Sequence, residues 1–372
     1  MKSSRPPFRA DHVGSLLRPD SLKAARDRYA RGEIPADELS RLEDAAIRES
    51  VRLQESAGLQ SITDGEMRRA MWHTDFLTGL EGIGLTHSDY QVAFKGSDGA
   101  TAGTTTMLAV NARVRRSRPI TLDHFRFVKD ATTRTAKLCI PSPTYLHMRG
   151  GRKVVPASVY PDIEAFWSDI IEAYRAEIAD LAAAGCSYLQ LDDVSFACLC
   201  DEAVRHQIAA DGEDPSLMPS KYAEVINRII AARPASMTVT MHTCRGNFMS
   251  MWMASGGYEA VAQAMLGLTA VDGFFMEYDS ERAGSFEPLR FVPKGRRVVL
   301  GLVSTKEARL EQKDALKRRI DEAARFMAIE DICIGPQCGF ASSHHGNRLS
   351  EDDQRRKLAL CVEVAHEVWG GL

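Results

Sequence analysis

The chain has 372 residues, of which 44% are hydrophobic and 26% are charged, as in an ordinary globular protein. These fractions exclude a disordered chain, a collagen-like chain and a disulfide-rich miniprotein. With 47 Lys and Arg against 50 Asp and Glu, the net charge of −3 provides no field that would attract nucleic acid or an anionic membrane. No apolar stretch is long enough for a bilayer span, and residues 1–10 lack the apolar core of a secretory signal, so we expect a cytoplasmic protein.

Short apolar strand candidates alternate with amphipathic helices along the chain. The clearest helix covers residues 162–184, where apolar side chains recur every three or four positions and Gly185 ends the pattern. Nearly every strand candidate is followed directly by a polar or reactive residue. In chain order, the predicted elements are strand 12–16, helix 36–57, strands 59–63 and 137–140, helix 162–184, strand 188–191, helix 222–232, strands 237–241, 273–276 and 298–303, helix 306–329 and strand 332–334.

Eight strand candidates with helices between them predict an α/β protein, a single (β/α)₈ TIM barrel over residues 1–372. In that fold the side chains at the carboxyl ends of the strands meet at one mouth, where active sites lie. An open doubly wound sheet is the alternative, but no glycine-rich phosphate turn follows the first strand candidate. Residues 81–134 are rich in Thr, Gly and Ser and interrupt the alternation, which predicts a hairpin insertion at the mouth after the second strand.

The eight cysteines fall into two groups according to their neighbours. In a chain of this length they are not a disulfide framework, and in a reducing compartment they are packing residues, nucleophiles or metal ligands. Cys244 and Cys338 each follow a strand candidate. The others have apolar neighbours and are predicted to be buried packing residues: Cys139, Cys186, Cys198, Cys200, Cys333 and Cys361.

Four residues at predicted strand ends are candidate metal ligands. His242 and Cys244 follow the fifth strand, and because residues two apart in an extended chain point the same way, both can reach one ion. Glu277 ends the sixth strand, and Cys338 follows the eighth in Gly-Pro-Gln-Cys-Gly. One imidazole, two thiolates and one carboxylate form a tetrahedral set that suits Zn²⁺.

The charge of such a centre indicates which chemistry it supports. Two thiolates and a carboxylate give the zinc site a net negative charge, which makes it a poor Lewis acid for splitting water. The carboxylate can give way to an incoming thiol, whose pKa the ion would lower. The ligand set therefore predicts a site that alkylates a substrate thiol rather than one that hydrolyses a bond.

Five motifs, taken jointly and in order, make the chain resemble the cobalamin-independent methionine synthases, specifically their catalytic C-terminal barrel. The resemblance covers essentially the whole chain, and it is specific for the superfamily rather than for one substrate. The motifs are Val-Gly-Ser at 13–15, Gln-Leu-Asp-Asp at 190–193, His-Thr-Cys at 242–244, Met-Glu at 276–277 followed by Ser-Glu-Arg at 280–282, and Gly-Pro-Gln-Cys-Gly at 335–339.

This resemblance implies a role for each of the matching residues. The four candidate ligands named above would bind zinc, and the substrate thiol would be homocysteine, which is methylated to methionine. Ser15 would bind the homocysteine carboxylate and Asp192 its amino group, while Glu66 would also contact the amino acid. We predict Asp192, Glu66 and Lys306 as the residues with catalytic roles.

Two departures from the family pattern concern the methyl donor. The large N-terminal half of the family is absent, so the donor is either methyl-tetrahydrofolate or a methyl-corrinoid protein. The family also carries a mobile catalytic His after the seventh strand, whereas this chain has Lys306 near that place. His344 and His345, which follow Cys338, are the candidates for a replacement proton source.

Several alternatives stay open at this stage. The same centre would serve another thiol, as in epoxyalkane:coenzyme M transferase, although Asp192 and Glu66 suit an amino-acid thiol better than a sulfonate. A metal-free barrel related to uroporphyrinogen decarboxylase and a zinc-dependent binding protein without turnover are the other classes.

Some of the single residues also have alternative roles. Arg245 and Lys306 are expected to be solvated unless they hold an anionic group. Ser15 and Asp192 would otherwise be helix caps, and Glu66 a surface ion pair. The protein would be a monomer or a homodimer.

Overall fold

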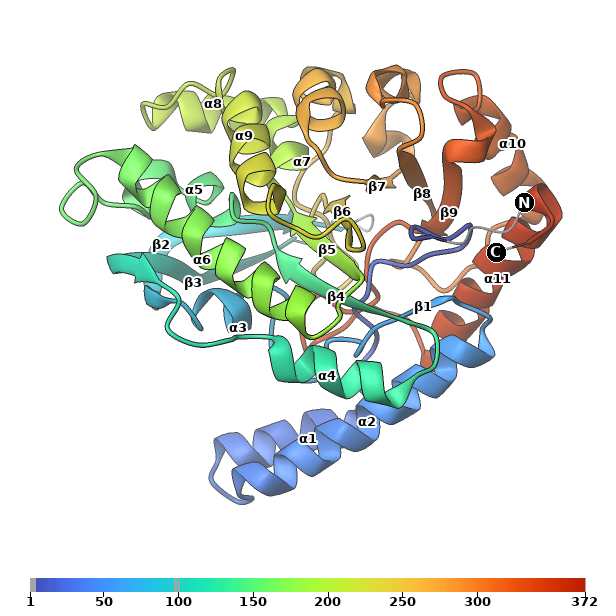
Figure 1. Ribbon diagram of the computed structural model, residues 1–372, viewed down its shortest axis with the longest axis horizontal. Coiled ribbons are helices and arrows are strands. Elements are labelled where there is room, and N and C mark those ends of the chain that lie inside the picture. Colours follow the sequence, from blue (N-terminus) through green and yellow to red (C-terminus); the bar gives the residue numbers. More distant parts are fainter. Residues whose placement is uncertain (1–4, 97–98, 100, 372) are drawn as a thin grey trace.

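The computed structural model describes residues 5–96, 99 and 101–371, and at its centre lies a curled parallel sheet with helices on its outside (Figure 1). The strand order is β1-β4-β5-β6-β7-β8-β9, so each strand pairs with the next one along the chain. The predicted α/β class is therefore confirmed. The sheet strands are β1 (Ser61–Ile62), β4 (Thr135–Pro141), β5 (Tyr188–Asp193), β6 (Thr238–Thr243), β7 (Gly273–Glu277), β8 (Arg297–Val303) and β9 (Ile332–Pro336).

The register of the sheet brings the strand ends to one level. Asp192 on β5 pairs with His242 on β6, and Glu277 on β7 pairs with Gly301 on β8. Parallel strands in such register present their carboxyl ends at the same rim. The residues that were predicted from their strand-end positions are consequently brought together by pairing alone.

The first predicted strand, residues 12–16, is not a strand among the described residues. Only Ala10 forms an isolated parallel bridge, with Ile334 of β9. Gly14 has a φ of +133°, which ends the extended conformation before Leu16. The Leu16 N–H donates to the Gly65 carbonyl 3.0 Å away, beyond β1. The N-terminal segment thus contacts both edges of the seven-stranded sheet without forming a regular eighth strand.

The helices cover the outer face of the sheet (Figure 1). The long predicted helices correspond to α2, α6 and α9, while α10 begins later than the predicted residue 306. Side chains compete for the backbone there, since the Glu311 carboxylate accepts from the Ser304 N–H at 2.8 Å. The helices are α1 (Asp20–Ala30), α2 (Ala36–Ser56), α3 (Thr74–Leu77), α4 (Leu122–Ala131), α5 (Tyr145–Met148), α6 (Ile163–Ala183), α7 (Ser195–Leu199), α8 (Glu202–Ala210), α9 (Met218–Ile230), α10 (Lys313–Ala323) and α11 (Glu351–Trp369).

Six short helical segments lie in the connections: η1 (Gly151–Lys153), η2 (Tyr258–Ala260), η3 (Gln263–Leu268), η4 (Glu281–Ala283), η5 (Glu287–Phe291) and η6 (Ile329–Asp331). Within the described ranges, no helix combines the length and the apolar character that crossing a bilayer would require.

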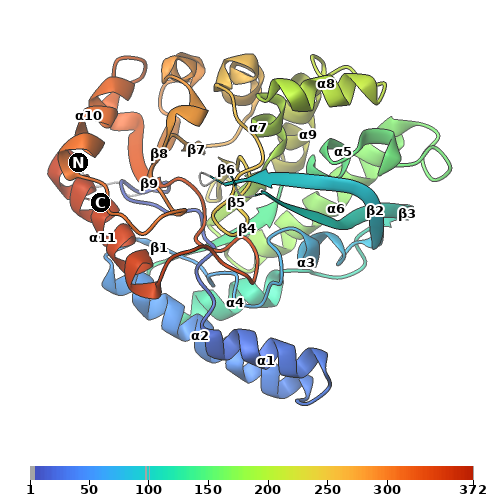
Figure 2. The same cartoon turned by 180° about the vertical axis from the view of Figure 1, so that it is seen from behind.

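A long antiparallel hairpin, β2 (Glu81–Lys95) and β3 (Thr101–Arg115), stands between β1 and β4, within the segment predicted as an insertion. Figure 2 shows it reaching across the molecule towards β6. Lys95 exchanges two backbone hydrogen bonds of 2.7 and 2.9 Å with Trp252, in the loop that follows β6. The segment also contains helix α4, where the sequence had predicted only hairpins.

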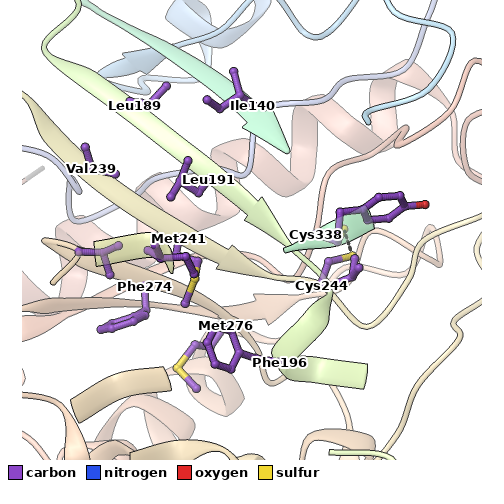
Figure 3. Packing of buried hydrophobic residues seen from close by; sticks show 14 of the residues in the cluster. Ile140, Leu189, Leu191, Phe196, Val239, Met241, Cys244, Phe274, Met276 and Cys338 are labelled. Atoms are coloured by element: carbon purple, nitrogen blue, oxygen red, sulfur yellow. Dashed lines mark hydrogen bonds between the residues drawn. The ribbon is translucent and has the colours of Figure 1, made fainter. Parts of the chain in front are cut away.

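Alternate residues of a strand face opposite sides of the sheet. Leu189, Leu191 and Met241 belong to the large core cluster between the sheet and the helices (Figure 3). A smaller buried cluster with Tyr188, Phe275 and other strand residues fills the interior of the curl. Gln190 and Asp192 alternate with the outward-facing leucines of β5 in the same way as Tyr188, so they also lie inside the curl.

Candidate metal centre

The four predicted ligands meet at the rim of the sheet. One ligand atom from each of His242, Cys244, Glu277 and Cys338 lies within 4.8 Å of the other three, and all four side chains are buried. The two sulfur atoms of Cys244 and Cys338 are 3.4 Å apart (Figure 3). Strand pairing and one short turn therefore bring together residues that are up to 96 positions apart in the chain, the difference between 338 and 242.

The backbone around each ligand is fixed by hydrogen bonds. The Cys244 N–H donates to the Asp193 carbonyl at 2.7 Å, which continues the β5–β6 pairing one step beyond β6. Cys338 follows β9 through a turn that passes close to β8. A Cβ atom at Gly301 would lie 2.5 Å from the Gln337 Cα atom, so only glycine lets this turn approach.

The hydrogen-bonding state of the cluster fits a metal ion. Neither ring nitrogen of His242 has a partner among the described residues, and the Glu277 Oε2 atom has none either. Buried polar atoms in proteins are almost always paired. These unpaired atoms converge with two thiols that contact each other, and an imidazole, a carboxylate and two thiols have the donor chemistry that tetrahedral zinc requires.

The electrostatics of the cluster favour one ionised thiol. The neighbouring Cys244 thiol, which hydrogen-bonds to Cys338, lowers the pKa of Cys338 well below its usual range, and His242 adds to this effect. The same contact raises the pKa of Cys244. Burial opposes charging of His242, but its Cys338 neighbour raises the His242 pKa nevertheless. Thiolate character, which metal binding needs, is thus already favoured at Cys338.

A cavity of about 230 Å³ opens onto the cluster. His242, Cys244 and Cys338 line it together with Ser15, Glu66 and Asp192, which are the predicted substrate residues. Glu277 is not part of the lining, so its carboxylate reaches the cluster from the side facing away from the cavity. The structure therefore joins the predicted metal ligands and the predicted substrate residues in one site.

Asp192 and Glu66, the two carboxylates predicted to bind substrate, both line this cavity. Asp192 accepts a 2.6 Å hydrogen bond from the Gln190 amide, and Glu66 pairs with Arg69 at 3.2 Å. Burial raises the pKa of Asp192 to about 6 and that of Glu66 to about 8. Glu66 has a φ of +59°, an uncommon conformation for a residue other than glycine. The surface ion pair considered for Glu66 is thus a buried one instead, with the Oε2 atom left without a partner.

Ser15 lies against the backbone that follows Cys338. Its carbonyl accepts from the Phe340 N–H at 2.9 Å. A Cβ atom on Gly339 would lie only 1.8 Å from the Ser15 hydroxyl oxygen. The glycine after Cys338 therefore makes room for the serine beside the metal ligand.

Lys306 and Arg245 lie beside the cluster but outside the cavity lining. The Lys306 ammonium donates to the Gly246 carbonyl and to the Asn247 side chain, each at 3.2 Å, so it holds the loop after β6. Arg245 is fully buried at 0% exposure, which corrects the expectation that it is solvated. Its side chain lies over the Tyr258 ring at 4.4 Å.

The outer wall of the cavity includes residues that the sequence did not single out. The ring centres of Phe94, on the hairpin, and Phe248 are 5.3 Å apart. His73, which also lines the cavity, contacts the hydroxyl of Tyr145 at 2.8 Å. His345 lines the cavity as well, whereas His344 contacts the Ala70 carbonyl. Hairpin residues carry no strand-end signature, so no sequence signal pointed to Phe94.

The six remaining cysteines lie away from this cluster. Five are buried and Cys200 is half-buried, and all six are free thiols. Among the described residues, the group of four ligands is the one cluster with metal-binding geometry, so Cys198 and Cys200 do not form a second site.

Sequence comparison places the chain among known proteins. A family model described as "Cobalamin-independent synthase, Catalytic domain" matches residues 8–367. "Uncharacterized protein YxjH" of Bacillus subtilis (strain 168) is 42% identical, over 99% of this chain and 96% of its own length. "Methionine synthase" of Pyrococcus abyssi is 24% identical, over 88% of this chain and 84% of its own.

Solved structures agree with the sequence comparison. A putative vitamin-B12 independent methionine synthase from Listeria monocytogenes superposes with a TM-score of 0.77 at 33% identity, covering 99% of this chain and all of the other. A B12-independent methionine synthase from Shewanella sp. W3-18-1 shares the fold, with a TM-score of 0.70 at 18% identity and 97% coverage of both chains. The protein thus belongs to the family described by the cobalamin-independent synthase catalytic domain.

Proposed function

We propose that the protein is a zinc-dependent methyltransferase that methylates the thiol of homocysteine to give methionine. The observation that carries this proposal is the convergence of His242, Cys244, Glu277 and Cys338 within 4.8 Å at the end of a cavity. The methionine synthase relative from Pyrococcus abyssi supports the choice of reaction. A bound zinc ion would supply a depressed thiol pKa and would keep the substrate sulfur as a nucleophile.

The residues of the deep cavity select the kind of thiol. Asp192 and Glu66 present two carboxyl groups beside the metal ligands, and a substrate ammonium group would pair with them. The Ser15 hydroxyl would accompany the substrate carboxylate. A sulfonate such as that of coenzyme M would instead face these acidic groups, so the site favours an amino-acid thiol.

The outer cavity would receive the methyl donor, either methyl-tetrahydrofolate or a methyl-corrinoid protein. Its wall includes Phe94, Phe248 and His345. His345 is the histidine after Cys338 that reaches the cavity, and we propose it as the group that exchanges a proton with the departing donor. We place the reaction in the cytoplasm, with no nucleic acid or membrane involved.

Metal analysis tests the proposal most directly. Protein purified without added metal should contain about one zinc per chain. Cys338→Ser should lose that zinc, and Cys333→Ser, which changes a buried thiol outside the cluster, should keep it. Absence of zinc from the wild type would contradict the proposal and favour the decarboxylase-like class.

A substrate panel then tests the reaction itself. Homocysteine and coenzyme M should be offered with methyl-tetrahydrofolate and with a methyl-corrinoid donor, and methionine should form from one of the homocysteine pairs. Methylation of coenzyme M alone would establish the alternative alkyltransferase. Tight homocysteine binding with no turnover from either donor would indicate a binding protein.

A further inference from the structure

Arg245 stands out among the buried cations of the described chain. The guanidinium nitrogens Nε, Nη1 and Nη2 all lack a hydrogen-bond partner, although the residue is 0% exposed. The other buried cations each donate to carbonyl or carboxylate oxygens: Arg9, Arg18, Arg69, Lys137 and Lys357. Its polar neighbours are the Tyr258 hydroxyl and the Cys200 thiol, and neither is an anionic or carbonyl oxygen. Because a buried charge without an ionic partner is costly, a second state in which Arg245 gains one would be stabilised.

The surroundings of Arg245 identify a neighbouring acceptor. Its backbone N–H donates to the Glu277 Oε1 atom at 3.0 Å. Its guanidinium lies over the ring of Tyr258, at 4.4 Å, and the Tyr258 hydroxyl is 3.1 Å from the Glu277 backbone nitrogen. The Glu277 backbone N–H and the Arg245 guanidinium therefore contact the same aromatic side chain. Glu277 also retains one carboxylate oxygen, Oε2, that has no partner.

Lys306, the other cation beside the cluster, already donates hydrogen bonds to three oxygen atoms. Its ammonium contacts Gly246, Asn247 and the carbonyl of Met251, the last at 3.4 Å. These three contacts match the three donors of an ammonium group. A carboxylate that moved away from the metal ligands would find free donors at Arg245 rather than at Lys306.

We propose that Arg245 is a positioning residue that receives the Glu277 carboxylate when a substrate thiolate takes its place among the metal ligands. This inference rests on the proposed function. In this exchange a zinc ion held by the four ligands would lose the Glu277 oxygen and gain the substrate sulfur, and the thiol proton would pass to solvent. The displaced carboxylate then stays buried, and a bidentate pair with the guanidinium compensates its charge.

Thiol binding to the zinc-loaded protein tests the inference without turnover. Calorimetry gives the dissociation constant of L-homocysteine, and X-ray absorption at the zinc edge counts the sulfur ligands before and after its addition. In the wild type, one oxygen ligand should be replaced by sulfur. In Arg245→Met, the dissociation constant should rise about tenfold or more, because the displaced carboxylate lacks its partner. Arg245→Lys should recover part of the affinity.

Two further proteins separate this role from general structural damage. Arg9→Met removes another buried arginine that lies over an aromatic ring, Trp369 at 5.4 Å, but at the opposite end of β9, and it should leave thiol binding unchanged. In a Glu277→Ala background no carboxylate is displaced, so adding an Arg245 substitution should cost no further affinity. If Arg245→Met does not fold, Arg245→Lys in the two backgrounds makes the same comparison.

The outcomes are distinct. If Arg245→Met binds homocysteine as tightly as the wild type and gains the same sulfur ligand, the inference is overturned. It is also overturned if the loss of affinity persists undiminished in the Glu277→Ala background. A wild type that holds no zinc, or that gains no sulfur ligand with homocysteine, overturns the proposed function itself and this inference with it.

Discussion

Two buried polar clusters lie inside the same curled sheet, and they differ in how their polar groups are paired. The first, which we call the lower cluster, consists of Asp11 and the side chains around it. The Asp11 carboxylate accepts hydrogen bonds from the Ser61 hydroxyl at 2.6 Å and the Tyr188 hydroxyl at 2.9 Å. It also lies 3.4 Å from the Lys137 ammonium. Lys137 in turn lies 4.0 Å from the centre of the Phe275 ring. The Asp11 and Lys137 charges are thus paired within the protein, although the Nδ1 atom of the adjacent His12, whose ring contacts the Ser61 carbonyl, has no partner.

The second, which we call the upper cluster, consists of the four candidate metal ligands with Glu66, Asp192 and Arg245. Several of its polar atoms have no hydrogen-bond partner within the protein. His242 has two ring nitrogens without partners, and Glu277, Glu66 and Arg245 each keep at least one unpaired polar atom. The side chains of both clusters are buried, although several of the upper cluster line the cavity. The difference indicates that the lower cluster contributes to folding, whereas the upper one is completed by groups from outside the chain.

The largest effect on stability should therefore come from the lower cluster. Lys137→Met leaves the Asp11 carboxylate buried without its cation, and the free energy of unfolding should fall by about 3–5 kcal/mol. Denaturant titration of the metal-free variant measures this. The zinc content of the fraction that folds should remain about one per chain. A stability unchanged within error would mean that the two clusters do not differ as described.

The upper cluster should stabilise the protein only when metal is present. At a free zinc concentration 100 times the dissociation constant, the folded state should gain about 2.7 kcal/mol over the metal-free protein. His242→Ala should abolish this gain while leaving the metal-free stability nearly unchanged, because His242 makes no internal hydrogen bond. Thermal unfolding with and without a chelator distinguishes the two proteins. A zinc-dependent gain that survives in His242→Ala would place the metal elsewhere.

The upper cluster could be predicted from the sequence because parallel strand pairing converts position in the chain into position in space. His242 and Glu277 lie at the carboxyl ends of β6 and β7, and Cys338 follows β9. Their meeting requires that these strands lie side by side in order and that a short turn follows β9. The same reasoning predicted eight strands, and seven of them are present in the sheet. It failed at residues 12–16, where the φ of Gly14 interrupts a segment whose composition alone favours extension.

The pairing of the polar groups could not be predicted in the same way. Nothing local distinguishes Arg245, which is buried without an acceptor, from Lys306, which holds a loop through three oxygen atoms. Both follow strand ends in the sequence. The position of the β2–β3 hairpin beside the cavity could not be predicted either. Its contact with the loop after β6, between Lys95 and Trp252, joins two segments that share no sequence periodicity.

The pH dependence of stability should separate the two clusters as well. Burial raises the pKa of Glu66 from 4.5 to about 8, so between these values the folded state holds a proton that the unfolded state has released. Stability from this group is complete below pH 4.5 and is lost as the pH rises through 8, with a fall of about 2 kcal/mol expected between pH 5 and 7 in the metal-free protein. Glu66→Gln should flatten this slope. Unfolding curves at several pH values measure it, and an equal slope in the variant would assign the effect to another group.

The smallest effect should come from a cysteine outside both clusters. Cys361 is fully buried in α11, and burial raises the pKa of its thiol, so it is expected to be inert. Cys361→Ala should lower the free energy of unfolding by about 1 kcal/mol through the small void that it leaves, with zinc content and thiol binding unchanged. In Cys338→Ser, by contrast, zinc should be lost while the stability of the metal-free protein changes little. The two variants together distinguish a cysteine that binds metal from a cysteine that only packs. Loss of zinc in Cys361→Ala would show that the buried thiols are not separable into these two classes.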